Sequence, residues 1–228
     1  VSPDGQQIAF HSERDGDFDI FIMDVDGGAA RNLTDNDIVD RLPAWSPDGA
    51  WLLFSSDVRG DNTQDLFRMR PDGTGRELLY SDAVQRSSHP RMSADGRYVV
   101  FTSGAPFDAA TWEIRRLDMQ TGEVIALTDN DFSDSSPVFA PDGSIVYQTV
   151  GEGDWALWQM DIDGANAREL YDGPGAEWGV TFSPDGRSII FTSNVTGEDE
   201  LYWLDLELLN PEQLTNDGGL YGWWVGSP

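Results

Sequence analysis

One four-residue pattern recurs at nearly even spacing along the whole chain. Its copies are Ser2-Pro3-Asp4-Gly5, Ser46-Pro47-Asp48-Gly49, Ser93-Ala94-Asp95-Gly96, Ala140-Pro141-Asp142-Gly143 and Ser183-Pro184-Asp185-Gly186. The Asp residues of successive copies are 43 to 47 residues apart, which is typical of β-propeller blades and too long for short solenoid coils. The repeat therefore predicts a single domain over residues 1–228, with repeats that start near residues 2, 46, 93, 140 and 183.

Each repeat contains four short segments with the composition of β-strands. The first follows the turn and is apolar on both faces, as in Leu52-Leu53-Phe54. The second, such as Leu66-Phe67-Arg68-Met69, has apolar first and fourth positions, and a polar third strand ends in a pair such as Leu127-Thr128. The fourth precedes the next turn, as in Val180-Thr181-Phe182. No apolar 3.6-residue period is long enough for a helix, so we expect an all-β propeller of five four-stranded blades.

The two ends of the chain match one another. The chain opens just before a Pro-Asp-Gly turn, and its last residues, Tyr221-Gly222-Trp223-Trp224-Val225-Gly226-Ser227-Pro228, match the strand that precedes such a turn. We therefore expect this C-terminal strand to join the first blade and close the ring, because closure removes an open sheet edge. The alternative is that the five repeats are part of a six- or seven-bladed ring.

The net charge restricts the partners. Asp and Glu number 41 against 14 basic residues, all of them Arg, and the formal net charge is −27. Such a field repels phosphate backbones and anionic lipid surfaces, so we expect no nucleic-acid partner and no membrane insertion, and cations or basic partners fit better. Cysteine is absent, which excludes disulfides and thiolate chemistry. The first residues do not resemble a signal peptide.

The repeat resembles the WD40-like, or PD40, repeat of TolB and of the propellers attached to prolyl-oligopeptidase-type enzymes. The match covers all five units and is close in Pro43-Ala44-Trp45-Ser46-Pro47-Asp48-Gly49 and in Asp15-Gly16-Asp17-Phe18-Asp19-Ile20-Phe21. The resemblance implies a periplasmic or extracellular domain that binds proteins or peptides or gates an attached enzyme. No Gly-x-Ser-x-Gly elbow accompanies it, so the chain carries no hydrolase domain of that type.

Acidic residues repeat at two places, and repetition favours a structural role for both. The Pro-Asp-Gly aspartates (Asp4, Asp48, Asp95, Asp142 and Asp185) have the residues of a β-turn around them. Acidic residues also precede the second strand, at Asp19, Asp65, Glu113 and Glu200. The hairpin that carries Asp15, Asp17 and Asp19 offers oxygen ligands for calcium, although it lacks the bidentate Glu of an EF-hand. No other cofactor is expected.

The residues that lead into the innermost strand are the candidate binding site. Those loops ring the channel on one face, where a rigid scaffold commonly presents binding residues. They differ from blade to blade, and the candidates are Asp40, Arg41, His89, Asp134, Glu177, Trp178, Tyr221 and Trp223. Exposed tryptophan and tyrosine favour sugar stacking or a protein contact, with core packing as the competing explanation.

These observations favour a non-catalytic binding module that recognises a protein, peptide or glycan through the channel face. The alternative is a carboxylate-based glycoside hydrolase that uses Asp40, Asp134 and Glu177. A structural or self-assembling block is the third interpretation.

Overall fold

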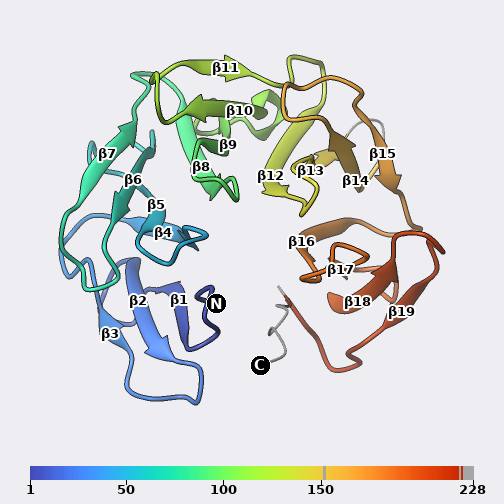
Figure 1. Cartoon of the computed structure of the whole chain (residues 1–228), viewed down its shortest axis with the longest axis horizontal. Coiled ribbons are helices and arrows are strands. Elements are labelled where there is room, and N and C mark those ends of the chain that lie inside the picture. The colour runs from blue at the N-terminus through green and yellow to red at the C-terminus, as the bar shows by residue number, and fades with distance from the viewer. Residues whose placement is uncertain (151–152, 221, 223–228) are drawn as a thin grey trace.

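The structure is a computed structural model, and it describes residues 1–150, 153–220 and 222. These residues form five antiparallel sheets arranged as blades around a central channel (Figure 1). Blade 1 comprises β1 (Gln7–Ser12), β2 (Asp19–Asp24) and β3 (Arg31–Asn32). Blade 2 comprises β4 (Asp40–Trp45), β5 (Leu52–Ser56), β6 (Asp65–Met69) and β7 (Glu77–Tyr80). The five-bladed all-β fold expected from the repeat is confirmed.

The other three blades repeat the four-stranded plan. Blade 3 contains β8 (Arg86–Met92), β9 (Tyr98–Gly104), β10 (Glu113–Asp118) and β11 (Val124–Ala126), with a short 3₁₀ helix, η1 (Ala109–Thr111), before β10. Blade 4 contains β12 (Ser133–Phe139), β13 (Ile145–Val150), β14 (Trp155–Met160) and β15 (Arg168–Tyr171). Blade 5 contains β16 (Glu177–Phe182), β17 (Ser188–Ser193), β18 (Glu200–Asp205) and β19 (Pro211–Gln213). In blades 2 to 5 the first strand, β4, β8, β12 or β16, lies nearest the channel (Figure 1).

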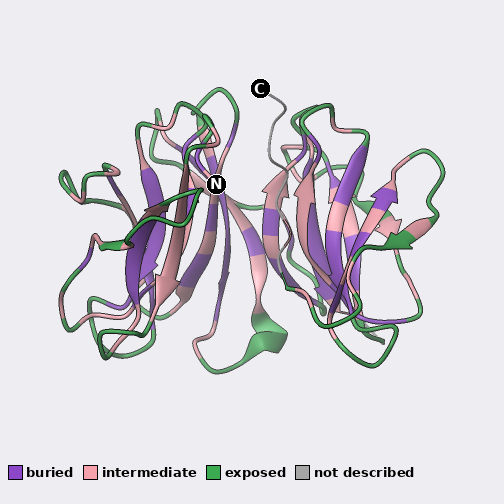
Figure 2. Cartoon of the chain, turned by 90° about the horizontal axis from the view of Figure 1, so that it is seen from below, coloured by how far each residue is buried: buried purple, intermediate pink, exposed green. Residues whose placement is uncertain are grey.

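The hydrophobic core lies between neighbouring blades. Successive side chains of a strand point to opposite faces, so a continuous apolar run supplies both neighbours. In β5, Leu52 and Phe54 pack against Ile20 of blade 1, whereas Leu53 packs with Val99 of blade 3. Two further clusters join blades 3 and 4 and blades 4 and 5. The buried residues therefore run along the strands, and exposed residues concentrate in the loops at both ends (Figure 2).

Blade 1 differs from the others because its described sheet has three strands. All six residues of β1 are half-buried, whereas the equivalent β5 is buried at all five positions. The expected closing strand falls almost entirely on residues 221 and 223–228, which lie outside the described residues. Within the described part of the chain, no helix has the length and apolar character needed to cross a membrane.

Candidate functional site

The Pro-Asp-Gly aspartates are turn residues, as their repetition predicts. The Ser46 hydroxyl donates to Asp48 Oδ1 at 2.6 Å, and the same oxygen accepts the Ala50 backbone N–H at 3.0 Å. Ser46 Oγ in turn accepts the Trp51 N–H at 2.9 Å. These donors lower the pKa of Asp48, with the Ser46 hydroxyl as the main cause. The same pattern recurs around Asp4, Asp95 and Asp185, so these carboxylates stabilise turns and leave the channel to other residues.

The acidic residues before the second strand are also structural. Thr34 Oγ1 donates to Asp19 Oδ1 at 3.0 Å and accepts the Ile20 N–H at 2.9 Å, while Asn32 donates to the other Asp19 oxygen at 2.8 Å. Both oxygens of Asp19 are therefore engaged within blade 1. Among the described residues no group of three or more His, Asp or Glu side chains could hold a metal ion, and Asp15, Asp17 and Asp19 are not brought together as such a group.

The six candidate residues that the structure describes lie inside the innermost strands and not in the loops where they were expected. Each of these strands contains a bulge, and the bulge residues Leu42, His89, Ser136 and Gly179 have φ between 52° and 68°. Proline follows the first three of these residues, and a proline cannot donate to a ladder. The bulge tightens the local twist and turns equivalent residues toward the channel. Leu, His and Ser are not residue types that indicate a positive φ, so the following proline was the sign of the bulge in the sequence, and without it the strand boundary was misplaced.

The three carboxylates predicted to ring the channel are buried and held within their own blades. Asp40 is fully buried and lies 3.4 Å from the Arg76 guanidinium, and Asn130 donates to Asp134 Oδ2 at 2.8 Å. Glu177, also fully buried, accepts the Gly173 N–H at 3.1 Å and the Ser193 hydroxyl at 3.2 Å. Burial raises the pKa of Glu177 to about 7 despite these donors. In the described structure no hydrogen bond or ion pair joins the three, and none of them lines either cavity described below.

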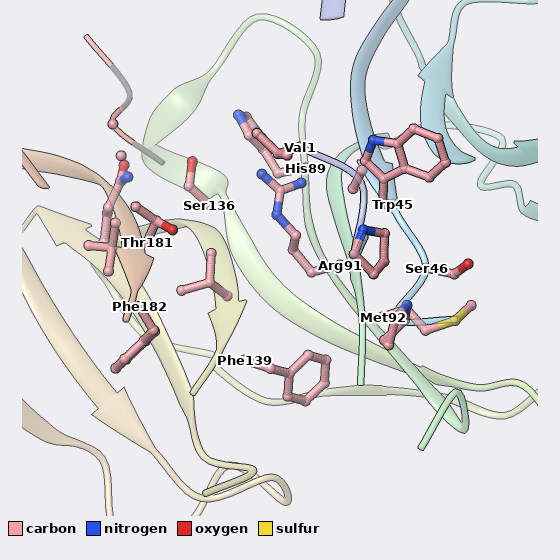
Figure 3. Close-up of a pocket in the computed structure, with 18 residues that line it drawn as sticks. Val1, Trp45, Ser46, His89, Arg91, Met92, Ser136, Phe139, Thr181 and Phe182 are labelled. Atoms are coloured by element: carbon pink, nitrogen blue, oxygen red, sulfur yellow. The ribbon is translucent and has the colours of Figure 1, made fainter. Parts of the chain in front are cut away.

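The channel itself contains a cavity of about 350 Å³. The innermost strands of blades 2 to 5 line it, together with the first residues of the chain. Figure 3 shows an apolar part, with Phe139 and Phe182, and a polar part, where His89 and Arg91 project from the same strand, β8. The channel therefore offers both apolar surface and hydrogen-bonding groups to a small ligand.

A second cavity, of about 420 Å³, opens at the end of the channel where the innermost strands begin. Three tryptophans, Trp112, Trp155 and Trp178, line it from blades 3, 4 and 5. His89, Ser136 and Gln148 line both cavities, so the two are contiguous. Trp178 and His89 are thus brought together, as the sequence predicts, whereas Tyr221 and Trp223 lie outside the described residues. We call this second cavity the channel mouth.

His89 is neutral at physiological pH. Burial lowers its pKa to about 3, and the positive charges of Arg91, Arg86 and His11 act in the same direction. Its Nδ1 lies 3.1 Å from the Ser88 hydroxyl. A neutral imidazole at the junction of the two cavities can both donate and accept a hydrogen bond, which suits recognition of a polar ligand.

Two tryptophans of the channel mouth were not predicted. Trp112 and Trp155 occupy one position of the repeat, directly before the position that holds an acidic residue in blades 1, 2, 3 and 5 and Ala156 in blade 4. The equivalent residues are Phe18, Gln64 and Asp199. The carbonyl oxygens of Phe18, Gln64 and Trp112 accept the N–H of the first or second residue of the next innermost strand, at 2.7 Å in each case. This position therefore also faces the mouth. The blade-to-blade variation used to choose Trp178 would have found it.

Comparisons with known proteins agree with this architecture. Residues 1–180 match the family model of the TolB beta propeller domain. An uncharacterised protein of Agrobacterium fabrum is 33% identical over 153 residues, which is 62% of this chain and 50% of that protein. The chain spans half or less of the length of the first curated relatives that it matches.

Solved structures share the fold at low sequence identity. TolB from Acinetobacter baumannii superposes with a TM-score of 0.79 at 21% identity, over 94% of this chain and 54% of that one. An oligogalacturonate lyase in complex with manganese has a TM-score of 0.70 at 20% identity, over 94% of this chain and 63% of the enzyme. Binding proteins and enzymes thus share this scaffold, so the fold alone does not assign the activity.

Proposed function

Because this chain belongs to the TolB beta propeller family, we propose that it is a non-catalytic binding module that recognises its ligand at the channel mouth. The ligand is a protein, peptide or glycan that inserts a ring-bearing group between Trp112, Trp155 and Trp178. The observation that supports this proposal most directly is the convergence of these three half-buried tryptophans on one cavity. Tryptophan supplies a large apolar face at low entropic cost and dominates many binding sites.

Polar side chains line the channel mouth beside the three tryptophans, and they are a second feature that supports binding. Gln148 and Asn194 present amides to the cavity, and His89 presents a neutral imidazole. Such groups fix the orientation of a ligand whose affinity comes mainly from apolar contact. His89 is held at the bulge of β8, Gln148 lies within β13, and Asn194 directly follows β17. These rigid blades favour binding without a large ordering cost.

The hydrolase alternative has less support. Asp40, Asp134 and Glu177 are each at most 1% exposed. Arg76 lies beside Asp40, Gly173 donates to Glu177, and Asn130 donates to one oxygen of Asp134, whose other oxygen is buried without a partner. A glycosidase needs two carboxyl groups that flank the scissile bond in an open site. We therefore favour binding over turnover, and by resemblance to TolB we also propose that the protein acts outside the cytoplasm, in the periplasm or beyond the cell.

The proposal can be tested by replacing tryptophan with 5-fluorotryptophan and recording ¹⁹F spectra. The chain contains 9 tryptophans, and single Trp→Phe variants assign their signals. A panel of peptides, oligosaccharides and extracts of envelope proteins is then added. We expect the signals of Trp112, Trp155 and Trp178 to shift together, because one ligand contacts all three.

Trp51 provides the matched control. The Arg68 guanidinium lies 4.1 Å from the centroid of the Trp51 ring, and Trp51 lines neither cavity. Trp178→Ala should weaken the binding of a shifting ligand about tenfold or more, and Trp51→Ala should leave it unchanged. If ligands shift Trp51 as much as the three mouth signals, or if Trp178→Ala has no effect on affinity, the proposed site is wrong. Turnover of an added oligosaccharide would instead support the hydrolase.

A further inference from the structure

Two arginines lie beside the channel mouth in a protein whose formal net charge is −27. Arg41 is the second residue of β4, and its guanidinium lies 3.9 Å from the ring centroid of Phe18. The His11 ring lies 5.5 Å from the same phenylalanine, and its Nδ1 is 3.4 Å from the N–H of the bulge residue Leu42. Arg41 and His11 therefore form one wall between blades 1 and 2, beside the residues that line the mouth cavity.

Arg86 extends this wall into blade 3. It is the first residue of β8, its Nε donates to Gln64 Oε1 at 3.2 Å, and its guanidinium lies 6.0 Å from the ring of Trp112. Trp112 lines the mouth cavity, so Arg86 stands where the cationic wall meets the aromatic one. The arginines therefore lie beside the mouth at blades 2 and 3, and the tryptophans line it from blades 3 to 5.

The two arginines of this wall lack carboxylate partners. In the described part of the chain, the ion pairs within 4 Å involve Arg59, Arg68, Arg76 and Arg97, and Arg41 Nε is buried with no hydrogen-bond partner. Asp57 is the acid whose charge favours the cationic form of Arg86, and its two oxygens already accept the N–H groups of Asp61 and Asn62.

Gathering these cations costs free energy. Burial lowers the pKa of Arg86, and the charge of Arg41 lowers it further. Burial and the charge of Arg41 also lower the pKa of His11 below its usual value of 6.5, so this imidazole favours its neutral form and the two arginines are the cations here. Half-buried cations that repel one another are stabilised when an anion joins them, because a charge-assisted hydrogen bond offsets the desolvation. The chain has 41 acidic residues, yet none forms an ion pair with Arg41 or Arg86 in the described structure.

We propose that the channel mouth binds a carboxylate, which Arg41 and Arg86 hold while the tryptophan-lined cavity takes the ring beside it. This inference rests on the proposed function and adds the charge of the ligand. Arginine suits the task because its planar fork matches a carboxylate in a bidentate manner. The net charge of the chain favoured cationic partners. Exposed charges farther away than about 10 Å are largely screened by salt, so the nearby Arg41 and Arg86 favour an anionic ligand at the mouth.

The test uses two matched pairs of probes that differ in a carboxylate: N-acetylphenylalanine with its amide, and glucuronic acid with glucose. Each is titrated into the full chain labelled with 5-fluorotryptophan, and the signals of Trp112, Trp155 and Trp178 are followed. We expect an acid to bind about tenfold more tightly than its neutral partner, as for a charge-assisted contact of about 1.4 kcal/mol. Tighter binding of N-acetylphenylalanine than of its amide indicates that the ligand is a peptide terminus. Tighter binding of glucuronic acid than of glucose indicates that it is an acidic sugar.

The variants Arg41→Gln and Arg86→Gln should abolish this preference and leave the binding of the neutral partner intact. Arg187→Gln is the matched control, because Arg187 is exposed in the turn at the opposite end of β16. Equal affinity of acid and neutral partner, or no binding of either acid, overturns the carboxylate proposal. If a neutral probe still shifts the three tryptophans in that case, the proposed function survives; if Trp178→Ala leaves the binding of every probe unchanged, the proposed function fails as well.

Discussion

A single buried carboxyl, Glu177, makes the stability of the propeller depend on pH. Its pKa is raised to about 7 in the fold and is about 4.3 in an unfolded chain. Between these values the folded state holds a proton that the unfolded state has lost, so this group lowers stability as pH rises from about 4.3 to 7 and adds no further change above. We therefore expect Glu177→Gln to raise the melting temperature more at pH 8 than at pH 4.

The control is the same pair of measurements on Asp199→Asn. Asp199 is half-buried beside the buried Glu200, so its replacement reports the effect of removing one charge from a chain with a net charge of −27. The difference between the two variants isolates the desolvation of Glu177. An equal gain from both variants at every pH would contradict the raised pKa.

At the residue scale, the sequence predicted the roles of the repeated side chains better than those of the unique ones. The aspartate of each turn and the acid before the second strand recur in several blades, which indicates that these blades use them for the same structural role. Glu177, His89 and Arg86 occur once each at their positions, and their properties depend on burial and on charges from other blades. Those surroundings come from contacts distant in the sequence, which the local pattern does not contain.

At the scale of the strand, a threonine hydroxyl fastens the outer strand to its neighbour. Thr128 Oγ1 accepts the Ile114 N–H at 2.9 Å and donates to Glu113 Oε2 at 2.5 Å, and the same relay joins Thr215, Leu201 and Glu200 in blade 5. In blade 4 the two partners are lost together, since Ala156 and Asp172 occupy the equivalent positions. The threonine and the acid therefore act as one unit.

Thr128→Val should destabilise the protein by about 1–3 kcal/mol, because it leaves a buried N–H and a carboxylate without their partner. Thr128→Ser keeps the hydroxyl and should lose less. The measurement is urea unfolding, where we expect a lower midpoint with an unchanged slope. Equal losses for the valine and serine variants would mean that the methyl group, and not the hydroxyl, stabilises this strand.

The strands and their order followed from the sequence, whereas the strand bulges did not. Alternating apolar runs and turn residues at a fixed period define a blade with little ambiguity. A bulge inserts one residue without changing that pattern, and the proline after Leu42, His89 and Ser136 was its available sign. The candidate residues were therefore chosen at the correct end of the blade but placed in loops instead of strands.

At the scale of the whole molecule, the joint between blades 5 and 1 decides whether the five blades act as a closed ring. Clusters of buried side chains join the other four pairs of neighbours, and among the described residues none joins blade 5 to blade 1. β1 is half-buried at every position, and within the described part of the chain no strand pairs with it on its channel side. An apolar strand at that edge would bury β1 and pair its free backbone groups.

We propose that residues 220–228 supply this strand, and their deletion should then lower the melting temperature. A strand worth about 3 kcal/mol or more corresponds to a loss of about 6–12 °C in a chain of this length. Val225→Pro keeps the length and composition of the segment but removes a backbone donor, so it should reproduce part of the loss. Val195→Pro, in the exposed hairpin between β17 and β18, is a control for a proline outside the strands. If the deletion and Val225→Pro both leave the melting temperature unchanged, the segment does not close the ring, and the exposed edge of β1 is then the place where another chain would pair.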